Sequence, residues 1–182
     1  MQKIIKKIFL LTVLMLAMSH VHAGIALGVC NSAITANAPD ERYSINGDGT
    51  VTDLWTGLMW KQCVEGQSGA SCNTGTNSTF TWSAALTLVD TVNGSGGFAT
   101  HTNWRLPNIK ELLSLVEFKC AAPARNKVAF PFNGASDYSY WSSSPTAIVA
   151  GNEVFYLDDE TGFFSETTIT SNLLVRLVRD TQ

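Results

Sequence analysis

Histidine is scarce in this sequence, and the short motifs that usually carry enzymatic chemistry do not occur in it. Of the three histidines, only His101 lies beyond the first 23 residues. There is no Cys-x-x-Cys pair and no Gly-x-Ser-x-Gly motif, which excludes a thioredoxin-like redox pair and the nucleophile elbow of a serine hydrolase. We therefore expect a protein that is not an enzyme. One alternative stays open, a carboxylate-based polysaccharide hydrolase, because its two acids can lie far apart in the sequence.

Positive charge is also sparse. The whole chain has 12 Lys and Arg against 15 Asp and Glu, and beyond residue 23 the count is nine against fifteen, a net charge of −6. With no basic stripe, nucleic acid is not an expected partner. A local patch of Lys119, Arg125 and Lys127 is the one place that could attract a sulfated polysaccharide, and the overall charge disfavours a purely electrostatic grip.

Long apolar runs are missing except at the start. Three lysines precede the apolar residues 8–18, and Val21-His22-Ala23 resembles a cleavage site. This pattern predicts a signal peptide over residues 1–23. The run is short for a membrane span, so we expect no transmembrane anchor after cleavage. The protein would then be exported, to the periplasm, the cell surface or the medium of a Gram-negative bacterium.

The rest of the chain is long enough for one domain with a real core. Residues 24–41 are small and polar and predict a flexible leader, tied down by Cys30. Residues 42–182 would form the folded domain.

The four cysteines are expected to form two disulfides, which an exported protein can keep. Cys63 and Cys72 flank a Gly- and Ser-rich stretch that reads as a loop. Their pairing leaves Cys30 with Cys120. A zinc site is the weaker interpretation, because it would need closer cysteine spacing or more histidine.

Turn and helix signals divide the domain into an early β meander, a helical middle and a β-rich end. Asn46-Gly47-Asp48-Gly49 predicts a hairpin between residues 42–45 and 50–53. Thr81 is expected to cap a helix through about Asn93, and Asn108 a second helix, with Glu111 in the position of a capping-box acid. Residues 138–144, 153–157, 163–165 and 173–179 predict strands. In the last of these, Arg176 and Arg179 alternate with aliphatic residues. Together these elements predict an α+β domain.

Several ordered motifs also resemble one known family. They are Asp48-Gly49-Thr50-Val51-Thr52-Asp53, Thr56-Gly57-Leu58-Met59-Trp60, Thr81-Trp82-Ser83-Ala84-Ala85, Asn103-Trp104-Arg105-Leu106-Pro107 with Glu111, Tyr140-Trp141-Ser142-Ser143-Ser144 and Val175-Arg176-Leu177-Val178-Arg179. The chain is similar over about residues 42–180 to the Legionella collagen-like C-terminal domain family. The resemblance implies a C-type-lectin-like fold with its terminal strands together and a loop-rich ligand face. It also implies a link to adhesion and to sulfated glycosaminoglycans, although this chain lacks collagen-like repeats.

The Trp-Arg-Leu-Pro run is expected to serve the fold. Apolar neighbours suggest partial burial of Arg105, and Glu111 is the nearest acid in the sequence. We predict a structural ion pair between Arg105 and Glu111, since a charge-assisted pair fixes local geometry. Trp60, Trp82 and Trp104 are expected in the core.

A ligand site is predicted in the C-terminal third, where rings and short polar groups occur together. Sugars stack their CH faces on rings and bond to amides and carboxylates. The ligand-binding candidates are Tyr138, Tyr140, Trp141, Asn152, Tyr156 and Phe164. Burial in the core is the favoured interpretation for Trp141 and Tyr156, and exposure for Tyr138, Tyr140 and Phe164. The expected partner is a glycan or a protein surface, and an assembly role in the cell envelope is the alternative.

No cofactor is expected. Asp158, Asp159 and Glu160 could hold calcium, which prefers oxygen ligands. A solvated hairpin turn is the stronger interpretation of this acidic cluster. Asn46, Asp48 and Asp53 are likewise read as turn residues, because they lack the spacing of an EF-hand.

Overall fold

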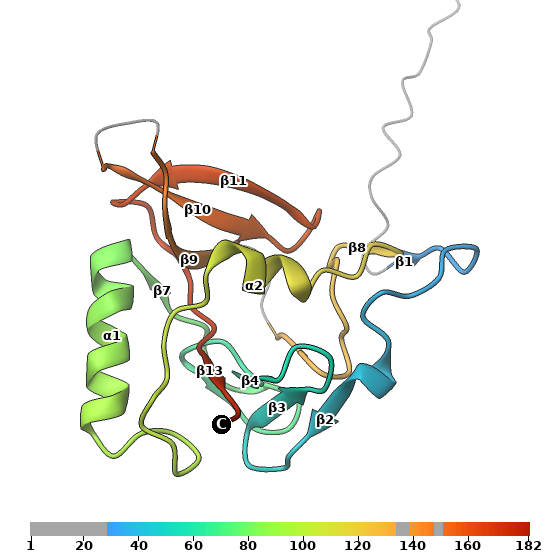
Figure 1. Ribbon diagram of the computed structural model, residues 1–182, viewed down its shortest axis with the longest axis horizontal. Helices are drawn as coiled ribbons and strands as arrows, with labels where there is room; N and C mark the ends of the chain where they lie inside the picture. Colours follow the sequence, from blue (N-terminus) through green and yellow to red (C-terminus); the bar gives the residue numbers. More distant parts are fainter. Residues whose placement is uncertain (1–28, 134–138, 148–150) are drawn as a thin grey trace, which may run out of the picture.

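The computed structural model describes residues 29–133, 139–147 and 151–182. The elements in these ranges, in chain order, are β1 (Val29–Cys30), the 3-10 helix η1 (Asp40–Arg42), β2 (Tyr43–Ile45), β3 (Thr50–Asp53), β4 (Leu58–Lys61), β5 (Gln67–Ser68), β6 (Thr74–Gly75), β7 (Thr79–Phe80), α1 (Trp82–Gly94), α2 (Ile109–Ser114), β8 (Cys120–Ala121), β9 (Ser139–Pro145), β10 (Glu153–Asp158), β11 (Phe163–Thr168), β12 (Leu173–Leu174) and β13 (Val178–Asp180). Short antiparallel strands in several sheets, with two helices between them, confirm the α+β class (Figure 1).

The predicted early meander is present and forms most of one sheet. Its strand order is β13-β4-β3-β2, and all its pairs are antiparallel. Gly47 and Gly49 have φ values of 81° and 87°, which residues with a Cβ rarely adopt, so the tight β2–β3 turn depends on them. Because β13 joins the early strands, the first and last parts of the domain lie side by side.

The second sheet is built from the C-terminal third and has the order β11-β10-β9-β12-β7. The strands β9, β10 and β11 form an antiparallel meander, whereas β12 runs parallel to β9. Among the described residues, β11 has no neighbour on its outer side. In Figure 1 the β10–β11 hairpin lies at one end of the molecule and the β2–β3 hairpin at the other.

The prediction for residues 173–179 is only partly right. Instead of one strand, the chain forms β12 in the second sheet and then β13 in the first sheet. Arg176 and Arg179 are both buried, with only 2% and 6% of them exposed. Arg176 donates to the carbonyl oxygens of Lys61 and Gln62, and its guanidinium carbon lies 5.0 Å from the Phe130 ring centroid. Carbonyl oxygens and an aromatic face therefore replace water around this cation.

Both helices begin where the sequence predicts. The Thr81 hydroxyl accepts a hydrogen bond from the Ala84 amide at the start of α1. Asn108 and Glu111 form the full capping box at the start of α2, with the Asn108 amide donating to Glu111 Oε2 at 2.7 Å. Each cap satisfies amides that a helix leaves unpaired at its N-terminus. The capping explains why a helix of only six residues forms at α2.

The core has two apolar clusters. One contains Trp60, Phe130 and Leu157 and joins α2 to both sheets. The other contains Trp104 and Trp141 and lies on the side of α1. Trp60 and Trp104 are buried as predicted, with 0% and 1% exposed. Trp82 is half-buried and packs against the second cluster.

Both predicted disulfides, Cys30–Cys120 and Cys63–Cys72, are present. The first closes 90 residues and the second only nine. The end of the predicted leader is held firmly, because Ala38 is 1% exposed and its amide donates to Glu117 Oε2.

The predicted signal peptide lies outside the described residues. Within the part of the chain that the structure describes, no helix is long and apolar enough to cross a bilayer.

Candidate functional site

The C-terminal meander places successive aromatic residues on opposite faces of the second sheet. Side chains alternate along a strand, and directly paired residues share a face. Tyr140 is paired with Leu157, and Leu157 with Phe164, so these three belong to one face. Trp141 is paired with Tyr156, and both belong to the other face. The predicted ligand-binding residues therefore do not form a single site.

Tyr140 and Trp141 belong to the core. The expectation that Tyr140 is exposed is wrong, since only 3% of it is accessible. Its hydroxyl lies 3.4 Å from Asp159 Oδ2, in a region that α2 covers. Trp141 is 0% exposed, as the core interpretation predicted, and its Nε1 donates to the Phe80 carbonyl oxygen at 2.6 Å. Neither ring can contact a ligand without unfolding the sheet around it.

Buried charge surrounds Tyr140. Burial would raise the pKa of its hydroxyl, but the positive charges of Arg125 and Arg176 outweigh that effect and hold the pKa below its ordinary value. Arg125 also forms a buried ion pair with Asp159. This arrangement gives each buried charge a partner or an aromatic ring, as a low-dielectric interior requires. Its role is structural.

The remaining candidates lie at or near the surface. Phe164 is 51% exposed, in agreement with the prediction. Tyr156 is half-buried and packs against the second core cluster. Asn152 is exposed, and its backbone carbonyl accepts a hydrogen bond from the Ile169 amide at 3.0 Å. Tyr138 lies outside the described residues.

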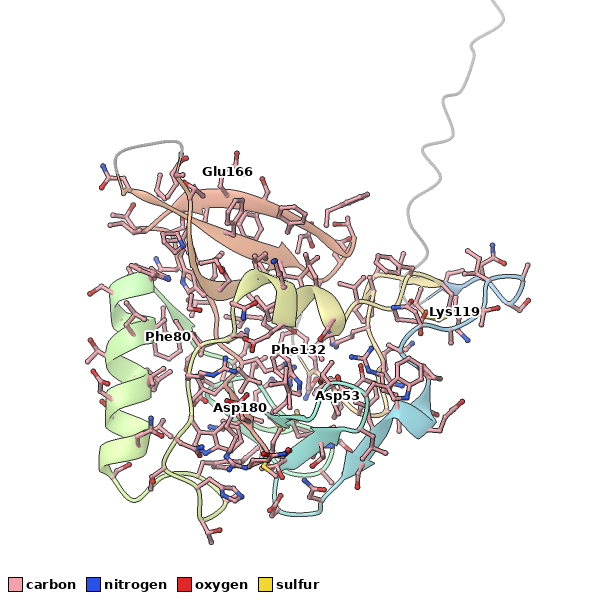
Figure 2. The ribbon with its side chains drawn as sticks, viewed as in Figure 1. Asp53, Phe80, Lys119, Phe132, Glu166 and Asp180 are labelled. Carbon is pink, nitrogen blue, oxygen red and sulfur yellow. A yellow bond between two sulfur atoms is a disulfide. The ribbon has the colours of Figure 1, made fainter. Side chains whose placement is uncertain are left out.

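A pair of phenylalanines on the hairpin was not among the predicted ligand residues. Phe155 and Phe164 share a face, and their ring centroids lie 5.8 Å apart at an interplanar angle of 67°. Glu166 is paired with Phe155 on the same face. Figure 2 shows Glu166 on β11 pointing away from the rest of the domain. We call Phe155, Phe164 and Glu166 the aromatic face. Phe164 and Glu166 are two residues apart, and this spacing places both on one face of a strand. It is the sequence feature from which the aromatic face could have been predicted.

Phe163 is the most exposed large apolar side chain that the structure describes, at 74%. It is paired with Asp158 at the hairpin end, so it belongs to the opposite face from Phe164. All six residues of β11 are exposed or half-buried. A strand with no covered face is unusual, because sheets normally bury one face against a core.

The acidic cluster after β10 is a turn, as the stronger interpretation predicted. Asp158 Oδ1 accepts from the Glu160 amide at 2.9 Å, and its Oδ2 accepts from the Thr161 hydroxyl at 3.0 Å. Asp159 points inward to Arg125. In the residues that the structure describes, no three His, Cys, Asp or Glu side chains gather closely enough to hold a metal ion. The contacts of Asp158 and Asp159 thus favour the turn interpretation of this acidic cluster over the weaker calcium interpretation.

The predicted ion pair of the Trp-Arg-Leu-Pro run is confirmed. Arg105 donates through both terminal nitrogens to the two carboxylate oxygens of Glu111, each at 2.8 Å. The hydrogen bond to Glu111 raises the pKa of Arg105. A backbone bridge also joins Arg105 to Val178 of β13. The pair thus ties the start of α2 to the C-terminal strand, which is a structural role.

The lysines of the predicted local patch meet in a hollow distant from the aromatic face. Lys119, Arg125 and Lys127 all line it, together with Asp40 and Glu41. Its charge is therefore mixed, unlike the purely basic patch that sequence proximity suggests. Figure 2 shows Lys119 and Glu166 on separate parts of the surface.

Comparison with known proteins identifies the domain. The model of one protein family, described as the Lcl C-terminal domain, matches residues 49–179, well over half of the chain. The match runs from the residue before β3 into β13 and includes both helices, and it begins after the leader and β2. No curated protein matches the chain.

Proposed function

We propose that this chain, which belongs to the Lcl C-terminal domain family, is an exported, non-catalytic module that binds glycans or other cell-surface ligands, in an adhesion-type role. The observation that carries the proposal is the aromatic face on the β10–β11 hairpin, whose outer strand β11 has no buried residue. Phe164 is half exposed and in ring contact with Phe155. Two disulfides in a chain without a membrane-spanning helix among its described residues fit an exported protein.

The aromatic face has the chemistry that a sugar ring needs. An exposed phenylalanine offers an apolar surface to the CH face of a pyranose. Around it, Glu166 supplies carboxylate oxygens, and Glu153 and Thr168, which are paired on the same face, supply further polar groups. Hydroxyl groups of a sugar can donate to these acceptors. The contact with the Phe155 ring positions Phe164 before a ligand arrives, which lowers the entropy cost of binding.

Binding fits the acidic residues better than hydrolysis does. A glycosidase needs two free carboxyl groups that face one substrate. In the acidic turn, Asp158 accepts hydrogen bonds from the Glu160 amide and the Thr161 hydroxyl. Asp159 forms an ion pair with Arg125. We therefore propose recognition without turnover.

An assembly role is the second candidate, and the open edge of β11 favours it. Among the described residues, β11 pairs only with β10. Its outer backbone groups are thus available to a strand from another protein, a recognised mode of peptide binding. The test below separates the two functions, because strand addition would not depend on a single ring.

The test is binding of the oxidised protein to a broad glycan array, in calcium and in EDTA. We expect saturable binding to at least one glycan, equal in both buffers because no described acidic cluster can hold calcium. Binding lost in EDTA would contradict this site. A blank array would shift the proposal to the assembly role.

A matched pair of variants makes the test specific. Phe164→Ala should reduce binding about tenfold or more, since a stacked ring contributes roughly 1–3 kcal/mol where it carries a contact. Phe163→Ala is the control, because Phe163 is the same residue type, adjacent and more exposed, but on the opposite face. Equal losses in both variants would indicate nonspecific apolar adsorption and would contradict the aromatic face.

A further inference from the structure

A hollow of about 370 Å³ lies between the leader and the chain that follows α2. Residues 30–41 form one wall, and residues 117–128 form the other. Its size is in the range of pockets that bind small ligands. The leader wall precedes residue 49, so it lies outside the segment that matches the family model. The hollow therefore depends on a part of this chain that the family match does not include.

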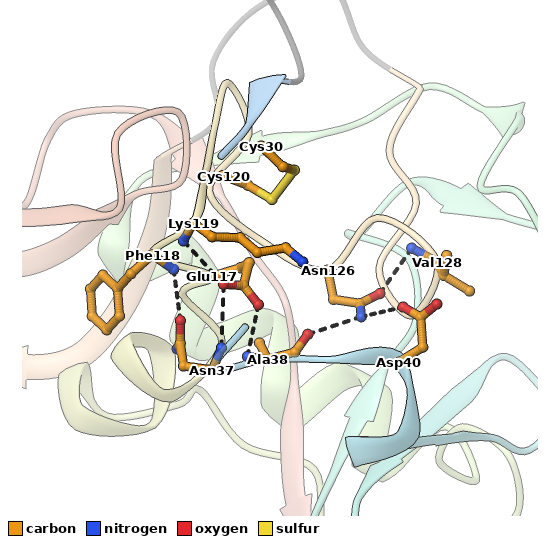
Figure 3. Close-up of a disulfide and its surroundings, with 10 residues drawn as sticks. All are labelled: Cys30, Asn37, Ala38, Asp40, Glu117, Phe118, Lys119, Cys120, Asn126 and Val128. Atoms are coloured by element: carbon orange, nitrogen blue, oxygen red, sulfur yellow. Dashed lines mark hydrogen bonds between the residues drawn. A yellow bond between two sulfur atoms is a disulfide. The ribbon is translucent and has the colours of Figure 1, made fainter. Parts of the chain in front are cut away.

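The two walls are fixed to each other by covalent and buried polar contacts (Figure 3). The Cys30–Cys120 disulfide closes one end. Glu117, which is 3% exposed, accepts hydrogen bonds from the amides of Asn37 and Ala38 at 3.3 and 2.8 Å. These bonds cross from the second wall to the leader. The hollow is thus a preformed cavity, and a ligand need not order the walls.

Asn126 makes a second set of bridges on the other side. Its Nδ2 donates to the Ala38 carbonyl oxygen at 3.0 Å and to Asp40 Oδ1 at 2.7 Å. Only 7% of Asn126 is exposed. Figure 3 shows the Lys119 side chain extending toward Asn126, with Asp40 on the other side of that amide. A cation and an anion therefore flank the same buried group.

Unpaired charges of both signs surround the hollow. Within the described ranges, Lys119, Lys127 and Glu41 form no ion pair, although all three line the cavity. Asp40 accepts one hydrogen bond and keeps further acceptor capacity. A purely anionic ligand would be repelled by Asp40 and Glu41. A purely cationic ligand would be repelled by Lys119 and Lys127. The charges are complementary to a ligand that carries both.

The remaining lining is apolar. Val128 is 59% exposed at the cavity, and Pro39 and the disulfide lie nearby in its wall. We propose that this hollow binds a small zwitterion with an apolar side group, namely a free amino acid or a short peptide. The ligand carboxylate pairs with Lys119 and Lys127, its ammonium pairs with Asp40 and Glu41, and its side group contacts Val128.

The test is calorimetric titration of the full oxidised protein with three forms of one dipeptide: leucyl-glycine, its N-acetylated form and its C-terminal amide. We expect leucyl-glycine to bind and each blocked form to bind about tenfold more weakly, because each loses one charge-assisted interaction. Equal binding of all three, or no binding of any, would overturn the proposal.

Variants locate the site. Glu41→Gln and Lys127→Gln change exposed side chains that form no hydrogen bond or ion pair with the described residues, so both proteins should unfold at the wild-type temperature. Glu41→Gln should weaken the binding of leucyl-glycine about tenfold and leave the binding of the N-acetylated form unchanged. Lys110→Gln, an exposed lysine on α2, is the matched control and should change nothing. Wild-type affinity in both pocket variants, or a loss in the control, would overturn the site. Phe164→Ala should leave dipeptide binding intact, which separates this site from the aromatic face.

Discussion

The four-stranded sheet and the β11 edge of the five-stranded sheet use aromatic and charged residues in opposite ways. In the four-stranded sheet, Trp60 and the Asp53 carboxylate are both fully buried, and Asp53 is paired with Arg42. In the five-stranded sheet, β11 places Phe163 and Phe164 in solvent and buries no charge. Both sheets contain antiparallel pairs, and both carry aromatic residues. The comparison teaches that the covering elements, and not the residue type, decide whether a ring serves the core or a binding surface.

The difference is also energetic. Burying a charge costs free energy unless a partner compensates for it, and Arg42 meets both oxygens of Asp53. Exposing a phenylalanine forgoes the stabilisation of burial, roughly 1.5–3 kcal/mol. The first sheet therefore contributes stability, and the edge of the second sheet gives up stability for a surface that can bind.

Truncating a ring inside the second sheet should have the largest effect. Trp141→Ala should lower the free energy of unfolding by about 4–5 kcal/mol, because it leaves a cavity and loses the bond to the Phe80 carbonyl oxygen. Chemical denaturation measures the change. A loss of less than about 1 kcal/mol would place Trp141 at the surface and remove the contrast with Phe164.

Breaking the buried ion pair of the first sheet should cost nearly as much. Asp53→Ala should destabilise the domain by about 3–5 kcal/mol, since it leaves the Arg42 charge buried without its carboxylate. The matched control is Asp90→Ala, which removes an exposed aspartate of α1 and should change the free energy of unfolding by less than about 0.5 kcal/mol. Equal effects would contradict the contrast between the buried and exposed charges.

The same pair should make stability fall in acid. Burial would raise the pKa of Asp53, but the hydrogen bonds and charge of Arg42 outweigh it and hold the pKa below its ordinary value. The stabilisation is therefore present above the unfolded-state pKa, about 4, and lost as the pH falls through the lower folded-state pKa. Denaturation of wild type and Asp53→Asn from about pH 6 to pH 3 should show the steeper loss in wild type. If the free energy of unfolding fell equally with pH in both proteins, the proposed contribution of Asp53 to acid sensitivity would be contradicted.

The smallest effect on stability should come from the exposed hairpin. Phe164→Ala should change the free energy of unfolding by no more than about 0.5 kcal/mol, because half of the ring is already in solvent. The same change should abolish most glycan binding. A destabilisation of several kcal/mol would show that the ring supports the fold, and the comparison between the two sheets would fail.

Local signals predicted much of this fold. Asn108 and Glu111 identified the start of α2, the glycines at 47 and 49 located the β2–β3 turn, and loop composition paired Cys63 with Cys72. Each of these features depends on residues close together in the sequence. The Arg105–Glu111 pair was predictable for the same reason.

Long-range packing was not predictable in the same way. Tyr140 and Phe164 have similar local sequences around them, but α2 covers the β9–β10 part of the sheet and leaves the β11 edge open. The burial of Arg176 could not be predicted from its neighbours, because its partners, the carbonyl oxygens of Lys61 and Gln62, are more than a hundred residues away. The mixed charge of the hollow also comes from two distant segments, the leader and residues 117–128.

The most direct measurement of the central claim is hydrogen–deuterium exchange of the protein with and without its strongest glycan from the array. Binding at the aromatic face predicts slower exchange in residues 153–168, which form β10, β11 and their turn, and no change in residues 43–61 of the first sheet. Protection of residues 43–61 with none in 153–168 would contradict the assignment of the binding surface to the β10–β11 hairpin.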